Sequence, residues 1–210
     1  MIFPPVPTRS GGGVAFSDAS DGDVRGDYVG RSDLARRLGI SDRWATLTQV
    51  HGSNVLEVEG PGDQGEADAM FTSVTGLPLA IFTADCAGVV VVAPGAIGVA
   101  HAGWRGAASG VVEALLTRMR SAGFDPAFAS IGPALGPCCL EVGPEVRKRF
   151  DGFTAQTSWG SESIDLYRAI TSQLPGLNVW AANKCTLHEP GWFSHRRDRT
   201  PARMATIAWL

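Results

Sequence analysis

Three residues with metal-binding side chains each follow an apolar, strand-like segment of the chain. They are His51, Cys86 and His101, at the ends of residues 45–50, 79–85 and 97–100. Imidazole nitrogen and thiolate sulfur are good zinc ligands, and three protein ligands leave one position open for water or substrate, as in catalytic zinc sites. A zinc-bound water can ionise near neutral pH and act as a nucleophile. The pattern therefore predicts an enzyme with a metal site at the rim of a sheet.

The same three residues allow two other interpretations, because such long spacings are less specific than the close cysteine pairs of a zinc finger. Cys86 could be a nucleophilic thiolate with His101 or His51 as its base. Alternatively, the triplet is a buried cysteine with two hydrogen-bonded histidines. Asp85, next to Cys86, could orient a histidine or cap the end of a strand.

Most of the expected strands come early in the chain. Residues 88–93 read GVVVVA, an apolar run rich in β-branched residues, which predicts a strand covered on both faces. Pro94 and Gly95 form a turn signal, so this strand and residues 97–101 are expected to pair as a hairpin. The full set of expected strands is 14–16, 45–50, 54–58, 68–73, 78–84, 88–93, 97–101, 127–131, 177–182 and 203–209.

Helical patterns dominate the later part of the chain. In residues 107–119, Val111, Leu115 and Met119 are spaced as on one face of an amphipathic helix. The other expected helices are 32–38, capped by Ser32 or Asp33, 144–150, with Pro144 in its first turn, and 163–174. The rest of the first thirty residues is rich in Gly, Asp, Ser and Pro and is expected to be loop. This order predicts an α+β or mixed α/β fold, and with no repeat or linker we expect one domain over residues 1–210.

Composition narrows the class of protein. The net charge of −3 gives no electrostatic argument for nucleic-acid or membrane-surface binding. No apolar run approaches the roughly 20 residues of a spanning helix. The N-terminus has no basic segment followed by a long apolar one, so a cytoplasmic location is expected. Cys138 and Cys139 are adjacent, which favours reduced thiols over disulfides for the four cysteines.

Several longer motifs resemble one family. They are TQVHGSNV (48–55), EADAMFTSVTGLPLAIFTADC (66–86), GVAHAGWRG (98–106), IGPALGPCCLEVGPEV (131–146), FSHRRD (193–198) and the closing ARMATIAWL. In this order they resemble the laccase-domain proteins, also described as multicopper polyphenol oxidase-like and as purine nucleoside phosphorylase-like. The resemblance extends from about Thr46 to the end of the chain. Gly88 stands where the family usually has proline.

The resemblance implies a fold, a metal and an activity. The fold is one of mixed β-sheets packed as a sandwich with flanking helices, grouped with cysteine-hydrolase-like toxin domains. The metal, zinc or alternatively copper, is bound by His51, Cys86 and His101, which would also be the catalytic residues. The activity is phosphorolysis of adenosine, inosine, guanosine and methylthioadenosine, together with adenosine deamination. The partners are then a purine nucleoside and phosphate, and the protein is a monomer or a dimer.

The resemblance leaves two alternative functions open. One is a copper-dependent phenol oxidase, although the four histidines of this chain are few for multicopper oxidation. The other is editing of peptidoglycan precursors, in which the pocket binds a cell-wall nucleotide or amino-acid moiety.

Further polar and aromatic residues are candidates for substrate binding. Arg105 and Arg196 could hold phosphate or a ribose oxygen, because guanidinium groups match oxyanions bidentately; otherwise they form ion pairs or a solvated basic loop. Glu141 could act as an acid or base or bind ribose hydroxyls. Trp104 could stack on a base or pack in the core.

The remaining cysteines are ambiguous. Cys138 and Cys139 lie in a loop rich in Gly and Pro, where one could border the pocket or both could be buried structural thiols. Cys185 and His188 form a C-x-x-H pair, for which the sequence shows no partner ligands.

Overall fold

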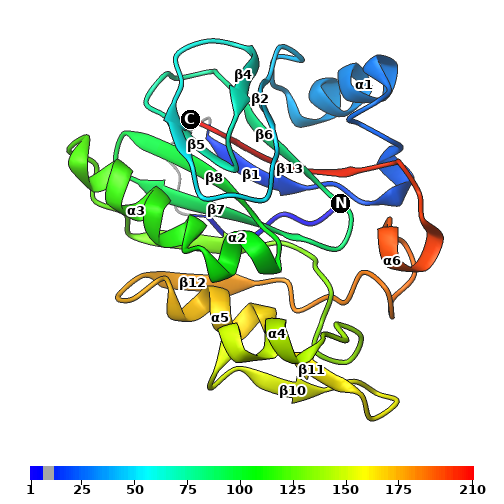
Figure 1. The fold of residues 1–210 in the computed structure, drawn as a ribbon. Coiled ribbons are helices and arrows are strands. Elements are labelled where there is room, and N and C mark those ends of the chain that lie inside the picture. The colour runs from blue at the N-terminus through cyan, green and yellow to red at the C-terminus, as the bar shows by residue number, and fades with distance from the viewer. Residues whose placement is uncertain (7–11) are drawn as a thin grey trace.

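The strands of the protein form two large sheets and one small one. The computed structural model describes residues 1–6 and 12–210 (Figure 1). Over those residues the sheets have five, six and two strands. Residues 7–11 of the expected N-terminal loop lie outside the described residues. The expected mixed α+β class is confirmed.

The strand orders of the sheets mix distant parts of the chain. The first sheet runs β1 (Gly13–Phe16), β13 (Met204–Trp209), β6 (Leu79–Thr83), β2 (Ala45–Thr48) and β4 (Gly62–Glu66). The second runs β12 (Asn178–Ala181), β9 (Phe128–Ile131), β7 (Ala87–Ala93), β8 (Ala96–Ala102), β5 (Ala69–Thr72) and β3 (Val55–Glu57). The small sheet pairs β10 (Thr154–Gln156) with β11 (Glu162–Ile164).

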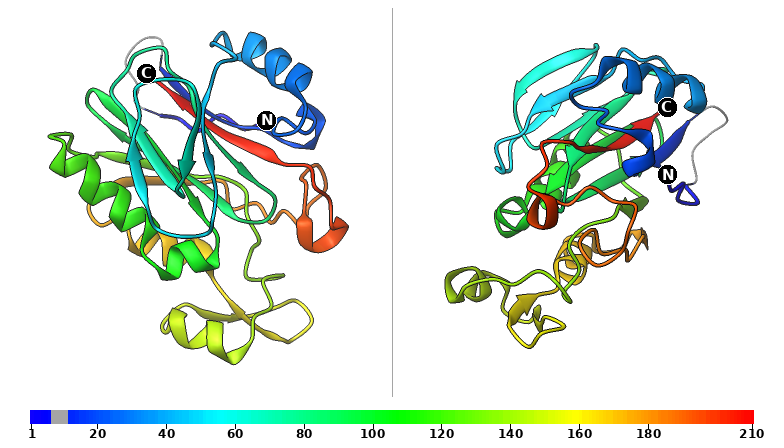
Figure 2. Two further views of the ribbon diagram at one scale, coloured as in Figure 1. Left: turned by 45° about the horizontal axis from the view of Figure 1, so that its top comes forward. Right: turned by 90° about the vertical axis from the view of Figure 1, so that its right-hand side faces the viewer.

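Helices cover the outer faces of both large sheets (Figures 1 and 2). The helix α1 packs on the first sheet, where Leu34 and Ala35 join a buried cluster with Ile207 of β13. The helices α2, α3 and α5 pack on the second sheet. The helices are α1 (Tyr28–Leu38), α2 (Trp104–Ala108), α3 (Val111–Ser121), α4 (Pro144–Arg147), α5 (Leu166–Ser172) and α6 (His195–Asp198), with 3-10 turns at Ala19–Asp21 and Lys148–Phe150.

Strand β7 shows why its sequence is continuously apolar. Val90 and Val92 face the first sheet and pack in the cluster between the two sheets. Val89 and Val91 face the other way and pack in the cluster that includes the helices. The strand is therefore buried on both faces, as its sequence predicts. Together these clusters give a sandwich of two sheets with helices outside.

The predicted hairpin is confirmed. Strands β7 and β8 pair antiparallel, with Ala93 opposite Ala96 and Gly95 in the turn at a φ of 81°. This register places Gly88 opposite His101. A Cβ atom on Gly88 would lie 1.9 Å from Oγ1 of Thr206 in β13, so glycine lets the two sheets approach closely here.

Two predicted helix boundaries were wrong because capping residues were overlooked. The first helix begins at Tyr28 rather than Ser32, because the Asp27 carboxylate accepts a hydrogen bond from the Val29 N–H at 2.9 Å. The helix expected over 163–174 begins only at Leu166, after the cap residue Asp165. Residues 162–164 are instead strand β11.

The helix expected over 107–119 is two helices. Helix α2 already begins at Trp104 and ends at Ala108, and α3 begins at Val111. Gly110 has a φ of 74°, a left-handed conformation that breaks the helical path between them. Gly110 therefore separates α2 from α3, and at the other end of α2 only Gly103 lies between it and β8.

The sequence did not predict the polar strands. Strand β4 reads GDQGE and is largely exposed. It pairs in parallel with β2, and Thr48 Oγ1 donates a hydrogen bond to the Asp63 carboxylate at 2.8 Å. An edge strand with this little burial carries no apolar alternation that a prediction could use.

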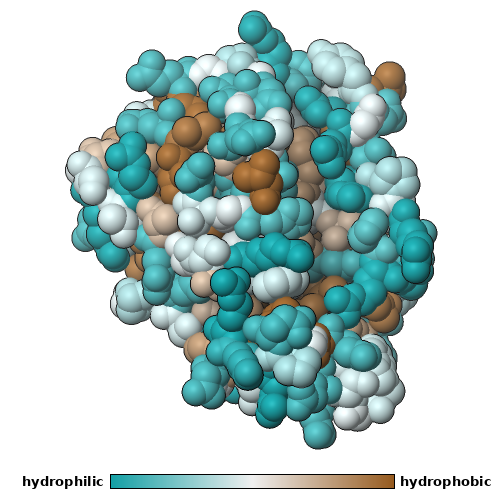
Figure 3. Space-filling model, viewed as in Figure 1, coloured by the Kyte–Doolittle hydropathy of each residue, from teal (hydrophilic) through white to brown (hydrophobic). Residues whose placement is uncertain are grey.

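On the face shown in Figure 3, apolar side chains form small patches separated by hydrophilic ones. In the part of the chain that the structure describes, no helix has the length and apolar character needed to cross a membrane.

Candidate metal centre

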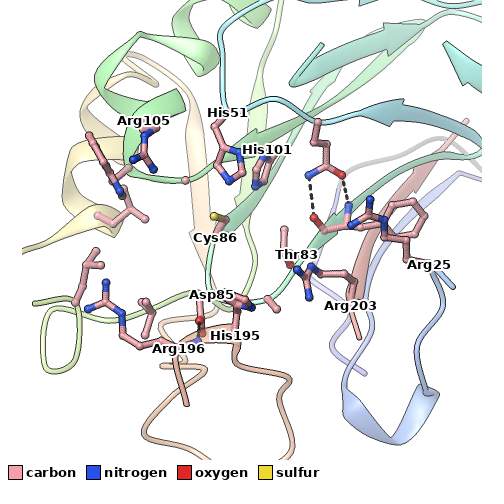
Figure 4. A pocket seen from close by; sticks show the side chains of 18 of the residues that line it. Arg25, His51, Thr83, Asp85, Cys86, His101, Arg105, His195, Arg196 and Arg203 are labelled. Carbon is pink, nitrogen blue, oxygen red and sulfur yellow. Dashed lines mark hydrogen bonds between the residues drawn. The ribbon is translucent and has the colours of Figure 1, made fainter. Parts of the chain in front are cut away.

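The three predicted ligands meet in one pocket. Its volume is about 450 Å³, and His51, Cys86 and His101 line it together (Figure 4). Their ligand atoms all lie within 4.8 Å of one another. The three side chains come from three different segments, so only the tertiary fold brings them together.

Each ligand is held by a short segment at a strand end. His101 belongs to β8, Cys86 lies in the link between β6 and β7, and His51 lies in the turn that follows β2. The backbone of His51 has a φ of 62° and that of Asp85 a φ of 90°. Such conformations are uncommon for residues with a Cβ atom and are typical of tightly constrained functional turns.

Gly103 is needed for the ligands to lie this close. A Cβ atom at this position would lie 2.7 Å from the sulfur of Cys86. The first glycine of the HAGWRG motif therefore leaves space for the Cys86 thiol beside the start of α2.

The Asp68 carboxylate holds two of the three ligands. It accepts hydrogen bonds from the backbone N–H groups of Val50, His51 and Gly52 at 3.2, 2.9 and 2.6 Å. It also lies 2.8 Å from Nδ1 of His101. Because Nδ1 of His101 faces this carboxylate, Nε2 is the nitrogen left to face the pocket.

The sequence prediction missed Asp68, although a signal was present. Asp68 is the acidic residue at the start of an apolar segment, and its side chain is fully buried. Asp85, which was considered for this orienting role, does something else: it accepts hydrogen bonds from Thr186 Oγ1 and from the Arg196 N–H, both at 2.7 Å. The Asp85 carboxylate therefore joins the segments that carry Thr186 and Arg196 to the link between β6 and β7, a role that neither sequence interpretation, histidine orientation or strand capping, describes.

The pKa values of Cys86 and His101 move in opposite directions. Burial would raise the pKa of Cys86, but hydrogen bonds with His101 and His51 and their charges lower it from 9.0 to about 6. Burial would lower the pKa of His101, but Asp68 and Cys86 raise it from 6.5 to about 9. Near neutral pH, the metal-free site therefore holds a thiolate beside an imidazolium.

Among the described residues, four arginines and His195 also line the pocket. The arginines are Arg105, Arg196, Arg203 and Arg25 (Figure 4). The guanidinium of Arg105 lies over the Trp104 ring at 4.3 Å, and Arg196 donates a hydrogen bond to the Glu141 carbonyl at 2.9 Å. This lining favours an anionic substrate.

Arg25 and Arg203 were not among the predicted site residues. Arg203 comes just before β13, in the closing motif, and its side chain donates hydrogen bonds to the carbonyls of Thr200 and Ala202, both at 2.9 Å. Arg25 comes from the loop before α1. Figure 4 shows Arg25, Arg203 and Thr83 on the same side of the metal-binding triplet. No local pattern marks Arg25, because only the packing of distant loops brings it to the pocket.

The basic run at residues 194–199 divides into two groups. His195 and Arg196 line the pocket. Arg197 does not: it donates hydrogen bonds to the carbonyls of Thr186, Leu187 and Trp192 and pairs with Asp198. Arg197 therefore fixes the loop, and Arg196 is the arginine of this run that can reach a substrate.

Glu141 lies outside the main pocket. It lines a neighbouring hollow with Trp159, whose Nε1 donates a hydrogen bond to its carboxylate at 2.8 Å. Arg196 lines both the hollow and the pocket. Cys138, Cys139 and Cys185 do not line the pocket either, whereas their neighbours Leu135 and Leu140 do.

Known proteins resemble this chain over nearly its whole length. A protein described as purine nucleoside phosphorylase ORF3, from Streptomyces griseus, is 38% identical and the match covers 95% of this chain and 85% of the relative. Purine nucleoside phosphorylase YfiH from Escherichia coli is 36% identical, covering 78% of this chain and 72% of that protein.

Solved structures agree with the architecture. YlmD from Geobacillus stearothermophilus superposes with a TM-score of 0.86 at 28% identity, covering 97% of this chain and 93% of that one. A hypothetical protein YfiH from Bacillus licheniformis gives 0.81 at 27% identity, covering 89% and 82%. The family model for multi-copper polyphenol oxidoreductase laccase matches residues 21–210. The chain thus belongs to the multi-copper polyphenol oxidoreductase laccase family.

Proposed function

We propose that this protein is a metal-dependent purine nucleoside phosphorylase. The observation that carries the proposal is one pocket in which an open His–Cys–His ligand set faces several arginines. The names of the relatives support the same activity. The proposed substrates are phosphate with adenosine, inosine, guanosine or methylthioadenosine, and adenosine deamination is proposed as a second activity.

The residues present fit a bound zinc ion. One sulfur and two imidazole nitrogens lie within 4.8 Å of one another, and all three residues line the pocket, so a bound ion would be accessible from it. Cys86 is already suited to bind as a thiolate, and Asp68 fixes the orientation of His101. When bound, the ion would supply Lewis acidity and lower the pKa of a water in the pocket. The same donors also suit copper, so copper remains the alternative metal.

In the proposed phosphorolysis, the arginines hold the anion. An oxygen of phosphate forms a bond to the anomeric carbon of ribose, while the glycosidic C–N bond breaks and its electron pair leaves with the purine. Arg25 and Arg203, which lie on the same side of the ligands as Thr83, are the proposed phosphate-binding residues.

The purine nucleoside is proposed to bind against the opposite wall. Trp104 offers an aromatic face, and Arg105 and Arg196 offer donors for the ribose oxygens or the base. Glu141 is proposed to act only through its neighbour Arg196, because it lies outside this pocket.

The deciding experiment is a chromatographic assay of a nucleoside panel with and without phosphate, run beside metal quantification. We expect ribose 1-phosphate and free base only when phosphate is present, and inosine from adenosine in either case. Cys86→Ala is expected to abolish both activities while the circular dichroism spectrum is retained. Full turnover by folded Cys86→Ala, or activity only on muropeptide precursors, would overturn the proposal.

A copper-dependent phenol oxidase is the second candidate, and the description of the family model favours it. Two of the four histidines, His51 and His101, lie in the ligand set; among the described residues His188 and His195 join no metal-binding group. A multicopper mechanism therefore has few ligands to draw on. The test uses protein made without added copper. If this protein contains stoichiometric copper and oxidises phenols, the result would favour this candidate.

A further inference from the structure

A second cluster of metal-binding side chains lies outside the pocket. The thiols of Cys138, Cys139 and Cys185 have their sulfur atoms all within 4.8 Å of one another. Cys139 and Cys185 are buried, and Cys138 is half-buried. All three are free thiols. Neither the proposed reaction nor the His51–Cys86–His101 site uses them.

Backbone pairing holds the two segments of the cluster together. Ala134 and Cys185 form a parallel bridge, in which the Ala134 N–H donates to the Lys184 carbonyl and the Thr186 N–H donates to the Ala134 carbonyl. The N–H of Cys139 donates to the Gly136 carbonyl at 3.0 Å. The sulfurs are therefore juxtaposed by the fold itself.

Amide groups surround the sulfur of Cys185. The N–H of Gly136 donates to it at 3.3 Å. The N–H groups of His188 and Leu187 also donate hydrogen bonds to this sulfur. Amide N–H groups that donate to a cysteine sulfur hold it in one orientation, as the hydrogen-bond partners of metal-binding side chains do.

The structure revises the expected C-x-x-H pair. The partners that the sequence did not show are Cys138 and Cys139, which come from a segment more than forty residues away. The side chain of His188 is exposed and is not part of the cluster; its backbone N–H faces the sulfur instead. The cluster is therefore made of sulfur alone over the described residues.

We propose that Cys138, Cys139 and Cys185 form a three-thiolate site for a soft monovalent ion, Cu(I). Thiolate ligands select soft ions, whereas structural zinc almost always takes four protein ligands. At a metal–sulfur distance of about 2.3 Å, three sulfurs around one ion lie about 4 Å apart. The observed limit of 4.8 Å requires only small rotations of the side chains. Binding would release the thiol protons to solvent.

The proposed ion would make the part of the pocket around Asp85 more rigid. Thr186, next to Cys185, donates to the Asp85 carboxylate, and the Leu135 N–H donates to the Asp85 carbonyl at 2.8 Å. Asp85 is the neighbour of Cys86 in sequence. An ion at the cluster would join the two segments that hold Asp85.

The test uses the full-length protein with Cys86→Ser, which removes the thiolate of the pocket site. The reduced protein is titrated anaerobically with Cu(I) in competition with a chromophoric Cu(I) chelator. We expect one tightly bound Cu(I) per chain, and X-ray absorption that shows three sulfur neighbours. Adding Cys185→Ser should weaken binding by more than about 100-fold. His188→Ala, also added to Cys86→Ser, is the matched control, and this double variant should bind Cu(I) as tightly as Cys86→Ser alone.

Clear outcomes would overturn the proposal. One is that Cys86→Ser does not compete with the chelator for Cu(I). Another is that the X-ray absorption spectrum shows nitrogen or oxygen neighbours of the bound copper. The third is that Cu(I) binding survives the substitution of Cys185. Circular dichroism checks the fold of each variant. If Cys86→Ser/Cys185→Ser does not fold, Cys86→Ser/Cys138→Ser replaces it, because Cys138 is only half-buried.

Discussion

The protein contains two compact groups of three metal-binding side chains, and they are built differently. In the first, His51, Cys86 and His101 line a pocket, and the Asp68 carboxylate bonds the backbone N–H of His51 and lies 2.8 Å from Nδ1 of His101. In the second, three cysteines lie outside that pocket, and the Gly136 N–H donates a hydrogen bond to the sulfur of Cys185. The first has acidic and basic side chains that complete its charges within the protein. Over the described residues the second consists of thiols alone, so binding a metal ion there would replace their protons.

The difference separates two requirements that a metal site must meet. A site that acts on a substrate needs an open position and an oriented ligand set, which the pocket and Asp68 supply. The proposed thiol site would only hold an ion, for which three matched sulfur donors suffice. The donor sets differ, because one combines two imidazoles with a thiol and the other has three thiols, and the first of them lines the pocket.

The largest expected effect is on catalysis. Cys86→Ala should reduce phosphorolysis of inosine to background, because it removes a ligand that faces the pocket. Cys185→Ala should leave the rate within about threefold, since its sulfur does not line the pocket. The measurement is a steady-state assay on folded, metal-analysed proteins. Equal losses in both variants would contradict the functional distinction between the clusters.

The next effect concerns the residue that orients the ligands. Asp68→Asn should lower zinc affinity and activity by about 10- to 100-fold, because the charge that orients His101 is lost while the shape is kept. Competition with a zinc chelator measures the affinity. The same substitution should leave Cu(I) binding at the thiol cluster unchanged. An unchanged zinc affinity would show that Asp68 serves only to stabilise the turn.

A smaller effect is expected in thiol reactivity. In chelator-treated protein at neutral pH, Cys86 should be alkylated by iodoacetamide before Cys138 and Cys139. The pKa of Cys86 is lowered to about 6 against the effect of burial, whereas burial and neighbouring cysteines raise the pKa of the other two. Peptide mass spectrometry over time gives the order. Zinc should protect Cys86; labelling of the cysteine pair first would contradict the assigned charges.

The smallest effect is on stability as a function of pH. Cys86 stabilises the metal-free fold increasingly as pH rises from about 6 to 9, because its folded pKa is lowered. His101 stabilises it fully below 6.5 and loses this contribution as pH rises to about 9, because its folded pKa is raised. The two slopes oppose each other, so the contribution of the pair should be nearly flat between pH 6.5 and 9.

Removing one member of the pair exposes the slope of the other. In Cys86→Ser, His101 keeps its Asp68 partner, so the free energy of unfolding should fall as pH rises through this window. Urea unfolding of chelator-treated protein at several pH values is the measurement, with wild-type protein as the control. A variant as flat as the wild type would show that the Asp68 partner alone does not raise the folded pKa of His101.

Much of the fold could be predicted where burial dictates residue type. The run GVVVVA specifies a strand buried on both faces, and β7 matches it closely. Polar edge strand β4 carries no such pattern, because few of its side chains are buried. The break at Gly110 was missed because the apolar spacing continues across it, and only the backbone conformation of that glycine separates the two helices.

The residues of the candidate site also differ in how far the sequence predicts them. The ligand triplet could be found because each member follows an apolar run, and the structure brings the three together. Arg25 and the thiol cluster could not be found, because loops that are distant in sequence create them. Asp68 lies between these cases: a buried carboxylate in an apolar segment implies a partner, but the sequence does not say which residue that partner is.

The placement of Asp68 also bears on how the protein is made. This carboxylate and all three ligands lie between residues 51 and 101, so a ribosome completes them before it synthesises α3. The strand β13, which joins β1 to β6, is made last, and Arg196 and Arg203 are made shortly before it. A nascent chain that ends after β8 thus contains every ligand of the metal centre but not the completed substrate pocket. The order of synthesis thus separates the three candidate ligands from the last arginines that line the pocket.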